Sequence, residues 1–283
     1  MSLRSKHLKL IGAAGAAALT VGTLASPALA VGHNLTYTCD APVGATSVTF
    51  DPGTVPAKMV AGQKVVNHNA KLTVHLNQQQ TGLAQSVGDH VRGKGTSKGA
   101  GNSLPFSMTF PNTAIPPAPA TTMDINGTGQ ATIRPLAAGT WTVKLGDMAA
   151  SLILSTGGTD TVTLPATCTA PTNTSKNLAT IAVSKDKSKT ATGASYNAKK
   201  DKATGTAKVK GKNFGLTGTG KVKFTLKKGT HKIKTIKGKL NKKGVAKVSF
   251  KHVKKAGKYS ITAKYLGNKA LKASSGKDTF KVK

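Results

Sequence analysis

After its first 30 residues, the chain is dominated by short runs in which apolar and polar residues alternate. In the clearest run, residues 258–265, Tyr, Ile, Ala and Tyr alternate with Lys, Ser, Thr and Lys. A period of two sends successive side chains to opposite faces of a β-strand, so each such strand is buried on one face and solvated on the other. Helical periodicity is almost absent, and the pattern predicts an all-β protein.

Strand-forming runs lie between clusters of Gly, Pro, Asn and Asp in both halves of the chain. In the first half, the pattern predicts strands at 35–39, 47–51, 70–76, 104–110, 131–134, 140–145, 150–154 and 161–167, with a hairpin turn at Gly146-Asp147. In the second half, it predicts strands at 221–226, 231–237, 245–251, 258–265 and 280–283, although the alternation in 231–237 is imperfect. Residues 81–103, rich in glycine, and 111–121, rich in Pro and Ala, are predicted to be long exposed loops.

A polar stretch at 170–175 has little to bury and separates two modules. We expect an export signal at 1–30, a β-sandwich domain at 31–170, a linker at 171–176 and a second β-sandwich domain at 177–283.

The first 30 residues have the composition of an export signal. Arg4, Lys6 and Lys9 precede an apolar stretch at 10–24, and Ala28-Leu29-Ala30 has the small-x-small form of a cleavage site. The apolar stretch is shorter than the roughly 20 residues that span a bilayer, and no later stretch approaches a membrane span. We therefore expect cleavage after Ala30 and a secreted, extracellular protein that can also associate with the cell surface.

Residues 164–167, Leu-Pro-Ala-Thr, resemble a sortase signal, but Cys168 stands where that signal has glycine and the site lies mid-chain. Covalent wall anchoring by that route is excluded, so any retention at the surface is expected to be non-covalent.

The only two cysteines, Cys39 and Cys168, lie near the start and the end of the first module. In an exported protein we expect them to form a disulfide. On the loop-entropy model, closing a loop of that length lowers the conformational entropy of the unfolded chain and stabilises the fold by about 5 kcal/mol. This value is comparable to the net stability of a small domain.

Charge divides the chain unevenly. Residues 176–283 contain 31 lysines and three acids, so 28 of the 33 net positive charges lie there, whereas residues 31–175 have a net charge of +2. The alternation of lysines with apolar residues indicates that lysine coats the solvent face of a folded domain.

Three blocks of the second module carry a family resemblance: residues 219–225 (TGKVKFT), 244–248 (GVAKV) and 256–268 (AGKYSITAKYLGN). They resemble the bacterial immunoglobulin-like repeat domain of secreted and surface proteins, and the resemblance covers most of 177–283. It implies a seven-stranded sandwich with Tyr259 near a tyrosine corner.

The first module resembles an uncharacterised secreted β-domain that is common in actinobacteria and often precedes immunoglobulin-like repeats. The resemblance rests on Tyr37-Thr38-Cys39 at its start, Leu104-Pro105-Phe106, residues 143–147 and Cys168 at its end. That family implies no activity and no site residues.

Catalytic patterns are weak in this chain. Glutamate is absent and the nine aspartates are scattered, which disfavours a paired-carboxylate hydrolase. Asp89 and His90 could serve a nucleophile such as Ser86, but no nucleophile-elbow or triad pattern surrounds them. We expect a non-enzymatic protein with no catalytic residues.

Metal and cofactor patterns are weak as well. His68 and His75 are seven residues apart, so they fall on opposite faces of one continuous strand. Residues 124–127, Asp-Ile-Asn-Gly, lack the further ligands of a calcium loop and are interpreted as a turn. We expect no metal site and no cofactor.

Clustered lysines are the best candidate for function, because they release counterions from a polyanion and give salt-sensitive, largely sequence-independent binding. The expected partners are anionic cell-envelope polymers or other polyanions, with nonspecific nucleic acid as a further candidate, and the protein is expected to be a monomer. The candidate binding residues are Lys221, Lys223, Lys227, Lys228, Lys242, Lys243, Lys247, Lys254, Lys255, Lys258 and Lys264.

Two alternatives remain open at this point. Lysines can simply keep an exported β-domain soluble and protect its edge strands. Alternatively, the first module is a specific carbohydrate- or protein-binding domain that uses the loops at 81–103 and 111–121, and the second module is a stalk.

Overall fold

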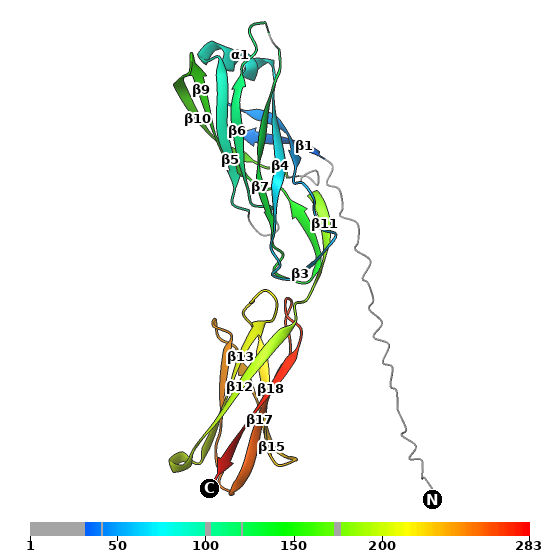
Figure 1. Ribbon diagram of the computed structural model, residues 1–283, viewed down its shortest axis with the longest axis vertical. Helices are drawn as coiled ribbons and strands as arrows, with labels where there is room; N and C mark the ends of the chain where they lie inside the picture. The colour runs from blue at the N-terminus through cyan, green and yellow to red at the C-terminus, as the bar shows by residue number, and fades with distance from the viewer. Residues whose placement is uncertain (1–31, 41, 100–102, 120, 173–176) are drawn as a thin grey trace, which may run out of the picture.

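The computed structural model describes residues 32–40, 42–99, 103–119, 121–172 and 177–283, and every structural statement below concerns these residues. They form two β-rich units arranged end to end along the long axis of the molecule (Figure 1), which confirms the all-β prediction. We call residues 32–184 the first unit and 185–283 the second unit. The export signal expected at 1–30 lies outside the described residues.

The first unit is built around eight antiparallel strands that pair in a closed order. In that order the strands are β1 (His33–Cys39), β10 (Thr159–Thr169), β9 (Met148–Thr156), β5 (His90–Ser97), β6 (Phe106–Ala114), β7 (Met123–Ile133), β4 (Val65–Leu76) and β2 (Ala45–Asp51), which returns to β1. Inward-facing residues alternate with exposed ones, and the rings of Phe50 and Phe106 pack 5.3 Å apart in the core. The eight strand positions predicted in this half are confirmed, with 131–134 being the end of the longer β7.

The long exposed loop predicted at 81–103 is wrong. The segment contains most of helix α1 (Gln78–Val87) and all of β5. A capping box begins the helix, because the Asn77 side chain accepts from the Gln80 backbone N–H and the Gln80 side chain accepts from the Asn77 N–H. Few apolar side chains face the core from this helix, so the hydrophobic pattern could not show it.

Glycine misled the prediction for β5 and for the turn at 124–127. Both segments are strand, and their glycines make room for the Phe110 ring: a Cβ on Gly95 would lie 3.3 Å from this ring, and one on Gly127 would lie 2.6 Å from it. The predicted loop at 111–121 is wrong in its first part as well, because β6 continues to Ala114. Glycine in a strand often marks such a close approach rather than a loop.

A second, three-stranded sheet closes one end of the first unit. Strand β11 (Asn177–Ser184) pairs in parallel with β3 (Lys58–Val60) and antiparallel with β8 (Gly139–Lys144). Leu178, Ile181 and Val183 of β11 are buried in the core of the first unit. Strand pairing therefore places the passage between the units at 185–187, whereas the sequence placed it at 171–176.

The second unit is a sandwich of seven strands in two sheets. One sheet has the order β12 (Ser188–Asn197), β13 (Lys202–Gly211) and β16 (Val245–Phe250), and the other has the order β15 (His231–Lys239), β14 (Lys221–Lys228), β17 (Gly257–Tyr265) and β18 (Ser274–Val282). The five strands predicted here are confirmed. Strands β12 and β13 were not predicted. In β13, small residues such as Ala203, Gly205 and Ala207 fill much of the inner face, so the strand lacks a pattern of large apolar residues.

Two tyrosines hold connecting segments of the second unit in place. The Tyr259 hydroxyl donates to the Lys255 carbonyl at 2.6 Å, four residues upstream, which is the hydrogen bond of a tyrosine corner. The Tyr265 hydroxyl donates to the Thr219 carbonyl at 3.0 Å, and burial raises the pKa of Tyr265. Both phenol rings are buried, so these bonds join turns to the core.

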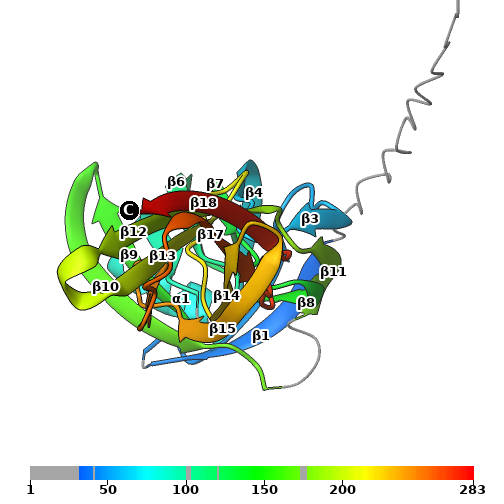
Figure 2. The ribbon, with the colours of Figure 1, turned by 90° about the horizontal axis from the view of Figure 1, so that it is seen from below.

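The two units touch at the end where the chain passes between them. Leu216 and Ala270 of the second unit pack against both hydrophobic cores, and the Ala138 N–H donates to the Lys269 carbonyl at 2.9 Å. Asp186, which is fully buried in the connection, accepts from the Asn213 side chain at 2.8 Å. The second unit lies in front of the first when the molecule is seen from below (Figure 2), and the C-terminus lies at the end far from the first unit (Figure 1).

Candidate functional site

The outer face of the four-stranded sheet in the second unit carries a single class of residue. In β14, Val222, Phe224 and Leu226 are buried, whereas Lys221 and Lys223 are exposed, and strand register extends this division across the sheet. The outward positions hold only Lys, Ser and Thr. We call this surface the lysine face and define it as Lys221, Lys223, Thr225, Lys227, Lys232, Thr235, Lys237, Lys239, Lys258, Ser260, Thr262, Lys264, Ser275, Lys277, Thr279 and Lys281.

Lysines of this face lie directly opposite one another on paired strands. Lys223 has Lys237 as its partner on one side and Lys264 on the other. Lys221 lies opposite Lys239 and Lys258 opposite Lys281. Like charges in directly opposite positions destabilise a sheet, so this arrangement costs stability when no anion is bound.

The three acids of the second unit do not neutralise the lysine face. Asp278 lies opposite the buried Ile261, and its carboxylate accepts from the Ala194 N–H at 2.7 Å. Asp201 lies 3.8 Å from the Lys254 ammonium, away from the face, and Asp186 is buried at the connection between the units. Glutamate is absent from the chain, so the positive charge of the face has no acidic partner on the same surface.

The eleven lysines proposed from the sequence do not form one site. Five lie on the lysine face: Lys221, Lys223, Lys227, Lys258 and Lys264. Lys242 and Lys243 lie in the turn between β15 and β16, and Lys247 faces outward from the other sheet, opposite Thr206. Lys228, Lys254 and Lys255 line a cleft at the far end of the unit.

The sequence prediction missed five lysines of the face: Lys232, Lys237, Lys239, Lys277 and Lys281. The alternation along β18, in which Lys277 and Lys281 occupy one face, could have indicated two of them. The neighbours of Lys223 could not be found from the sequence, because they depend on which strands pair and in which register.

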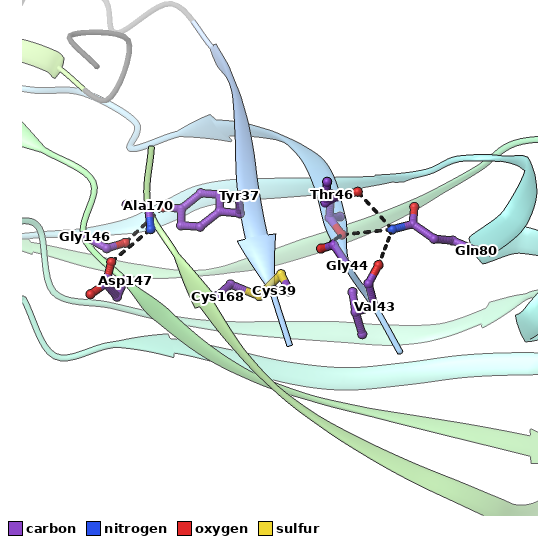
Figure 3. The surroundings of a disulfide bond; sticks show 11 residues. Tyr37, Cys39, Val43, Gly44, Thr46, Gln80, Gly146, Asp147, Cys168 and Ala170 are labelled. Carbon is purple, nitrogen blue, oxygen red and sulfur yellow. Dashed lines mark hydrogen bonds between the residues drawn. A yellow bond between two sulfur atoms is a disulfide. The ribbon is translucent and has the colours of Figure 1, made fainter. Parts of the chain in front are cut away.

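The disulfide predicted between Cys39 and Cys168 is confirmed. The two residues lie directly opposite each other on β1 and β10, and both are buried (Figure 3). Nearby, the Tyr37 hydroxyl donates to the Gly146 carbonyl at 3.0 Å, and Asp147 accepts from the Ala170 N–H at 2.9 Å (Figure 3).

These contacts make the surroundings of the disulfide a structural cluster. Burial first, and the charge of Asp147 second, raise the pKa of Tyr37, so the phenol stays protonated and donates its hydrogen bond. The hairpin turn predicted at Gly146-Asp147 is wrong, because these residues link β8 and β9, which belong to different sheets.

Asp89 and His90 form a pair, but the structure does not assemble a catalytic set around them. The Asp89 carboxylate lies 2.9 Å from His90 Nδ1, whereas Ser86 Oγ donates to the Leu83 carbonyl. The Gly157 N–H, and then His90, hold the pKa of Asp89 below its usual range. Asp89 thus fastens the turn between β9 and β10 and does not contact Ser86.

The histidines of β4 are likewise separated. His75 Nδ1 lies 2.7 Å from the Asp124 carboxylate, and His68 lies in the register shift between Asn67 and Ala70. Within the described ranges, no three His, Cys, Asp or Glu side chains gather as a metal site would require. No helix in this part of the chain is both long and apolar enough to cross a membrane.

Residues 36–179 match the model of a family described as a family of unknown function, DUF6801. The match spans just over half of the chain, and the chain belongs to this family. It covers the closed ring of strands and the start of β11, whereas the lysine face lies outside it. The match agrees with the resemblance of the first module to an uncharacterised domain family.

Other comparisons add little. No curated protein matches the chain. Among solved structures, the chain is similar to the crystal structure of chicken CNTN1 FN1-FN3 domains, with 7% identity, a TM-score of 0.23, and coverage of 84% of this chain and 77% of that one. A similarity at this TM-score supports no argument about function.

Proposed function

We propose that this is a non-enzymatic secreted or cell-surface protein whose second unit adheres electrostatically to anionic polymers of the cell envelope. The observation that carries the proposal is the lysine face, with ten lysines and no acid among its outward positions. In this proposal, the second unit is a lysine-rich relative of the bacterial immunoglobulin-like repeat, and its seven strands and the Tyr259 hydrogen bond support that assignment.

Counterion release provides the mechanism. The row Lys237–Lys223–Lys264 presents one ammonium group per strand, and neighbouring strands are about 4.8 Å apart. A polyanion lying across the strands meets these charges in succession and displaces its condensed counterions. It also screens the repulsion between opposite lysines, so binding recovers stability that the free sheet lacks.

Recognition of this kind reads charge and not sequence. Phe224, Phe250, Tyr259 and Tyr265 are buried, so they offer no stacking platform for bases. Arginine, the preferred fork for bidentate recognition, is absent from the second unit. Nucleic acid is therefore expected to bind as one polyanion among others.

Two matched triple variants test the proposal on the protein without residues 1–30. Lys223→Thr, Lys237→Thr and Lys264→Thr together remove one row of the lysine face. Lys208→Thr, Lys210→Thr and Lys247→Thr remove the same charge from the outer surface of the other sheet. Both are compared with wild type for retention on immobilised polyphosphate and on purified cell envelope.

We expect wild-type binding to weaken about tenfold or more between 50 and 200 mM salt, and the row variant to lose more affinity than the control. Binding that does not change with salt would contradict the proposal. Equal losses of affinity in the two variants would show that binding depends on the net charge of the second unit and not on the lysine face. No binding to either material, with aggregation of the row variant, would support a role in solubility only.

The alternative function, a specific carbohydrate- or protein-binding first unit on a stalk, loses the expected ligand loop at 81–103 and the first part of the one at 111–121. Residues 81–103 include most of α1 and all of β5, and β5 is a member of the closed ring, so deletion of this segment would disrupt the fold. Salt-resistant retention of the row variant on cell envelope would favour this alternative.

A further inference from the structure

A cleft of about 640 Å³ opens at the end of the second unit that lies far from the first. It lies between the turn joining β14 to β15 and the segment 251–256 joining β16 to β17. Gly257, which follows that segment, pairs with Val282 beside the C-terminus, and the C-terminus marks the far end of the molecule in Figure 1. The cleft is separate from the lysine face and is not covered by the first unit.

Positive groups converge on this cleft without an acid among its lining residues. The cationic lining residues are Lys228, Lys234, Lys251, Lys254 and Lys255, joined by His231 and His252. The nearest acid in contact with them is Asp201, whose carboxylate lies 3.8 Å from the Lys254 ammonium and also accepts from the Tyr196 hydroxyl. One carboxylate cannot balance five ammonium groups, so the cleft favours an anion.

The base of the cleft is apolar. Leu226, Phe250, Val253 and Tyr259 line it from the hydrophobic core, and the Lys228 ammonium lies 5.9 Å from the centre of the Tyr259 ring. The exposed rim includes Ile233, a large apolar side chain that is 48% exposed. The cleft therefore offers a cationic wall and an apolar contact to the same ligand.

A strand irregularity places Ile233 at this rim. Leu226 pairs with Lys234 and Lys227 pairs with Lys232, so the register shifts and Ile233 is left without a partner on β14. The shift explains the imperfect alternation of residues 231–237 in the sequence. Such bulges re-aim a side chain and are over-represented next to functional sites.

Hydrogen bonds fix the opposite wall. The Val253 N–H donates to the Asp201 carbonyl at 2.9 Å, and the Tyr259 hydroxyl donates to the Lys255 carbonyl. Directly before Val253, His252 adopts φ of 62°, a left-handed conformation that is uncommon for residues other than glycine. The wall is held in one conformation before a ligand arrives, which lowers the entropic cost of binding.

We infer that this cleft binds a phosphate ester that carries an apolar group. The lysine ammonium groups contact the phosphate, since lysine binds phosphate as a point charge, and the apolar group packs against Ile233. The volume lies within the roughly 300–1,000 Å³ of small-molecule sites. The ester can be a soluble molecule or the headgroup of an anionic lipid, and the two sources share this chemistry.

Calorimetry of the protein without residues 1–30 tests the site with octyl phosphate below its micelle concentration, inorganic phosphate and the neutral octyl glucoside. We expect octyl phosphate to bind most tightly. Ile233→Thr should weaken it by about fivefold to tenfold, because the apolar contact is lost. Lys251→Gln with Lys255→Gln should weaken octyl phosphate and inorganic phosphate alike.

Controls separate this site from the lysine face. Lys237→Gln with Lys264→Gln should leave octyl phosphate binding unchanged, and Ile233→Thr should leave polyphosphate binding unchanged. The inference is overturned if octyl phosphate binds no better than inorganic phosphate, or if the lysine-face variant weakens it as much as the cleft variants do. Circular dichroism confirms that each variant is folded.

Vesicles of phosphatidylcholine with 20% phosphatidic acid distinguish the two sources. Co-sedimentation that Ile233→Thr abolishes supports a lipid headgroup. Binding of octyl phosphate without co-sedimentation supports a soluble ester. Failure of both probes sinks the inference, while polyphosphate retention by the lysine face would stand or fall separately.

Discussion

The two units bury alternating apolar side chains at very different densities of positive charge. Residues 32–184 carry nine basic residues against six aspartates, whereas residues 185–283 carry thirty lysines against three aspartates. The first unit closes its main sheet into a ring and adds a disulfide, and the second has two open sheets and no cysteine. The second unit, which has the greater charge repulsion, thus lacks both the closed sheet and the disulfide that stabilise the first unit.

Where the lysines lie decides between a role in solubility and a role in binding. Strand β15 is at an edge of its sheet, so Lys234, Lys237 and Lys239 protect it against pairing with another chain. Lys223 and Lys264 lie on β14 and β17, which are flanked by strands on both sides and need no such protection. Edge protection therefore explains Lys237 but not Lys223 and Lys264, the other two lysines of the row on which the binding proposal rests.

The largest expected effect concerns the disulfide of the first unit. Replacing both cysteines, Cys39→Ala with Cys168→Ala, should lower the free energy of unfolding of this unit by up to about 5 kcal/mol, because the bond closes a loop with a separation of 129 residues. Fluorescence of Trp141, the single tryptophan, reports on this unit during denaturant unfolding. The melting of the second unit should not move, and an equal shift in both units would show that they unfold as one.

The second largest effect concerns the buried carboxylate at the start of the second unit. Asp186→Ala should lower the stability of this unit by about 2–3 kcal/mol, because the Asn213 side chain and two backbone N–H groups lose a charged acceptor. Asp186→Asn, which keeps one acceptor oxygen, should cost less. Calorimetric unfolding measures both, and equal effects would show that the acceptor oxygen that asparagine keeps contributes nothing without the charge of Asp186.

A smaller effect, a gain in stability, tests whether repulsion between lysines of the lysine face destabilises the second unit. Lys223→Thr should stabilise the second unit by about 0.2–1 kcal/mol at low salt, because two directly opposite like charges lose their neighbour. Lys247→Thr is the matched control, since the residue opposite Lys247 is Thr206. The gain should shrink as salt screens the repulsion, and stabilisation by the control to the same degree would refute the pairwise cause.

Much of the fold could be predicted because most core strands use large apolar side chains at alternate positions. The prediction failed where small residues do the packing. Gly95 and Gly127 fit beneath Phe110, and Ala203 and Ala207 face the core from β13, so these strands lacked an apolar pattern. Helix α1 depends on the capping box of Asn77 and Gln80 more than on an apolar stripe.

For the candidate site, the sequence predicts the abundance of lysine but not how the lysines are arranged across the sheet. The sequence shows that the second unit is rich in lysine, and alternation along β14 shows which lysines face outward. It does not show that Lys237 and Lys264 flank Lys223, because register across three strands is a tertiary property. The cleft depends in turn on a register shift that appears in the sequence only as an imperfect period.

The smallest expected effect concerns the Asp89 carboxyl group of the first unit. The pKa of Asp89 is held below its usual range by the Gly157 N–H and then by His90, so the folded state favours the charged form. A group with a lowered pKa stabilises the fold above its unfolded pKa, near 4, and this stabilisation is lost as pH falls through the lower folded pKa. Asp89→Asn should therefore be slightly less stable than wild type at pH 6–7, and the difference should narrow as the pH falls below about 4. Trp141 fluorescence during urea unfolding across this range measures it. A difference that did not narrow below pH 4 would contradict the prediction, because the stabilisation would then not depend on the charged form of Asp89.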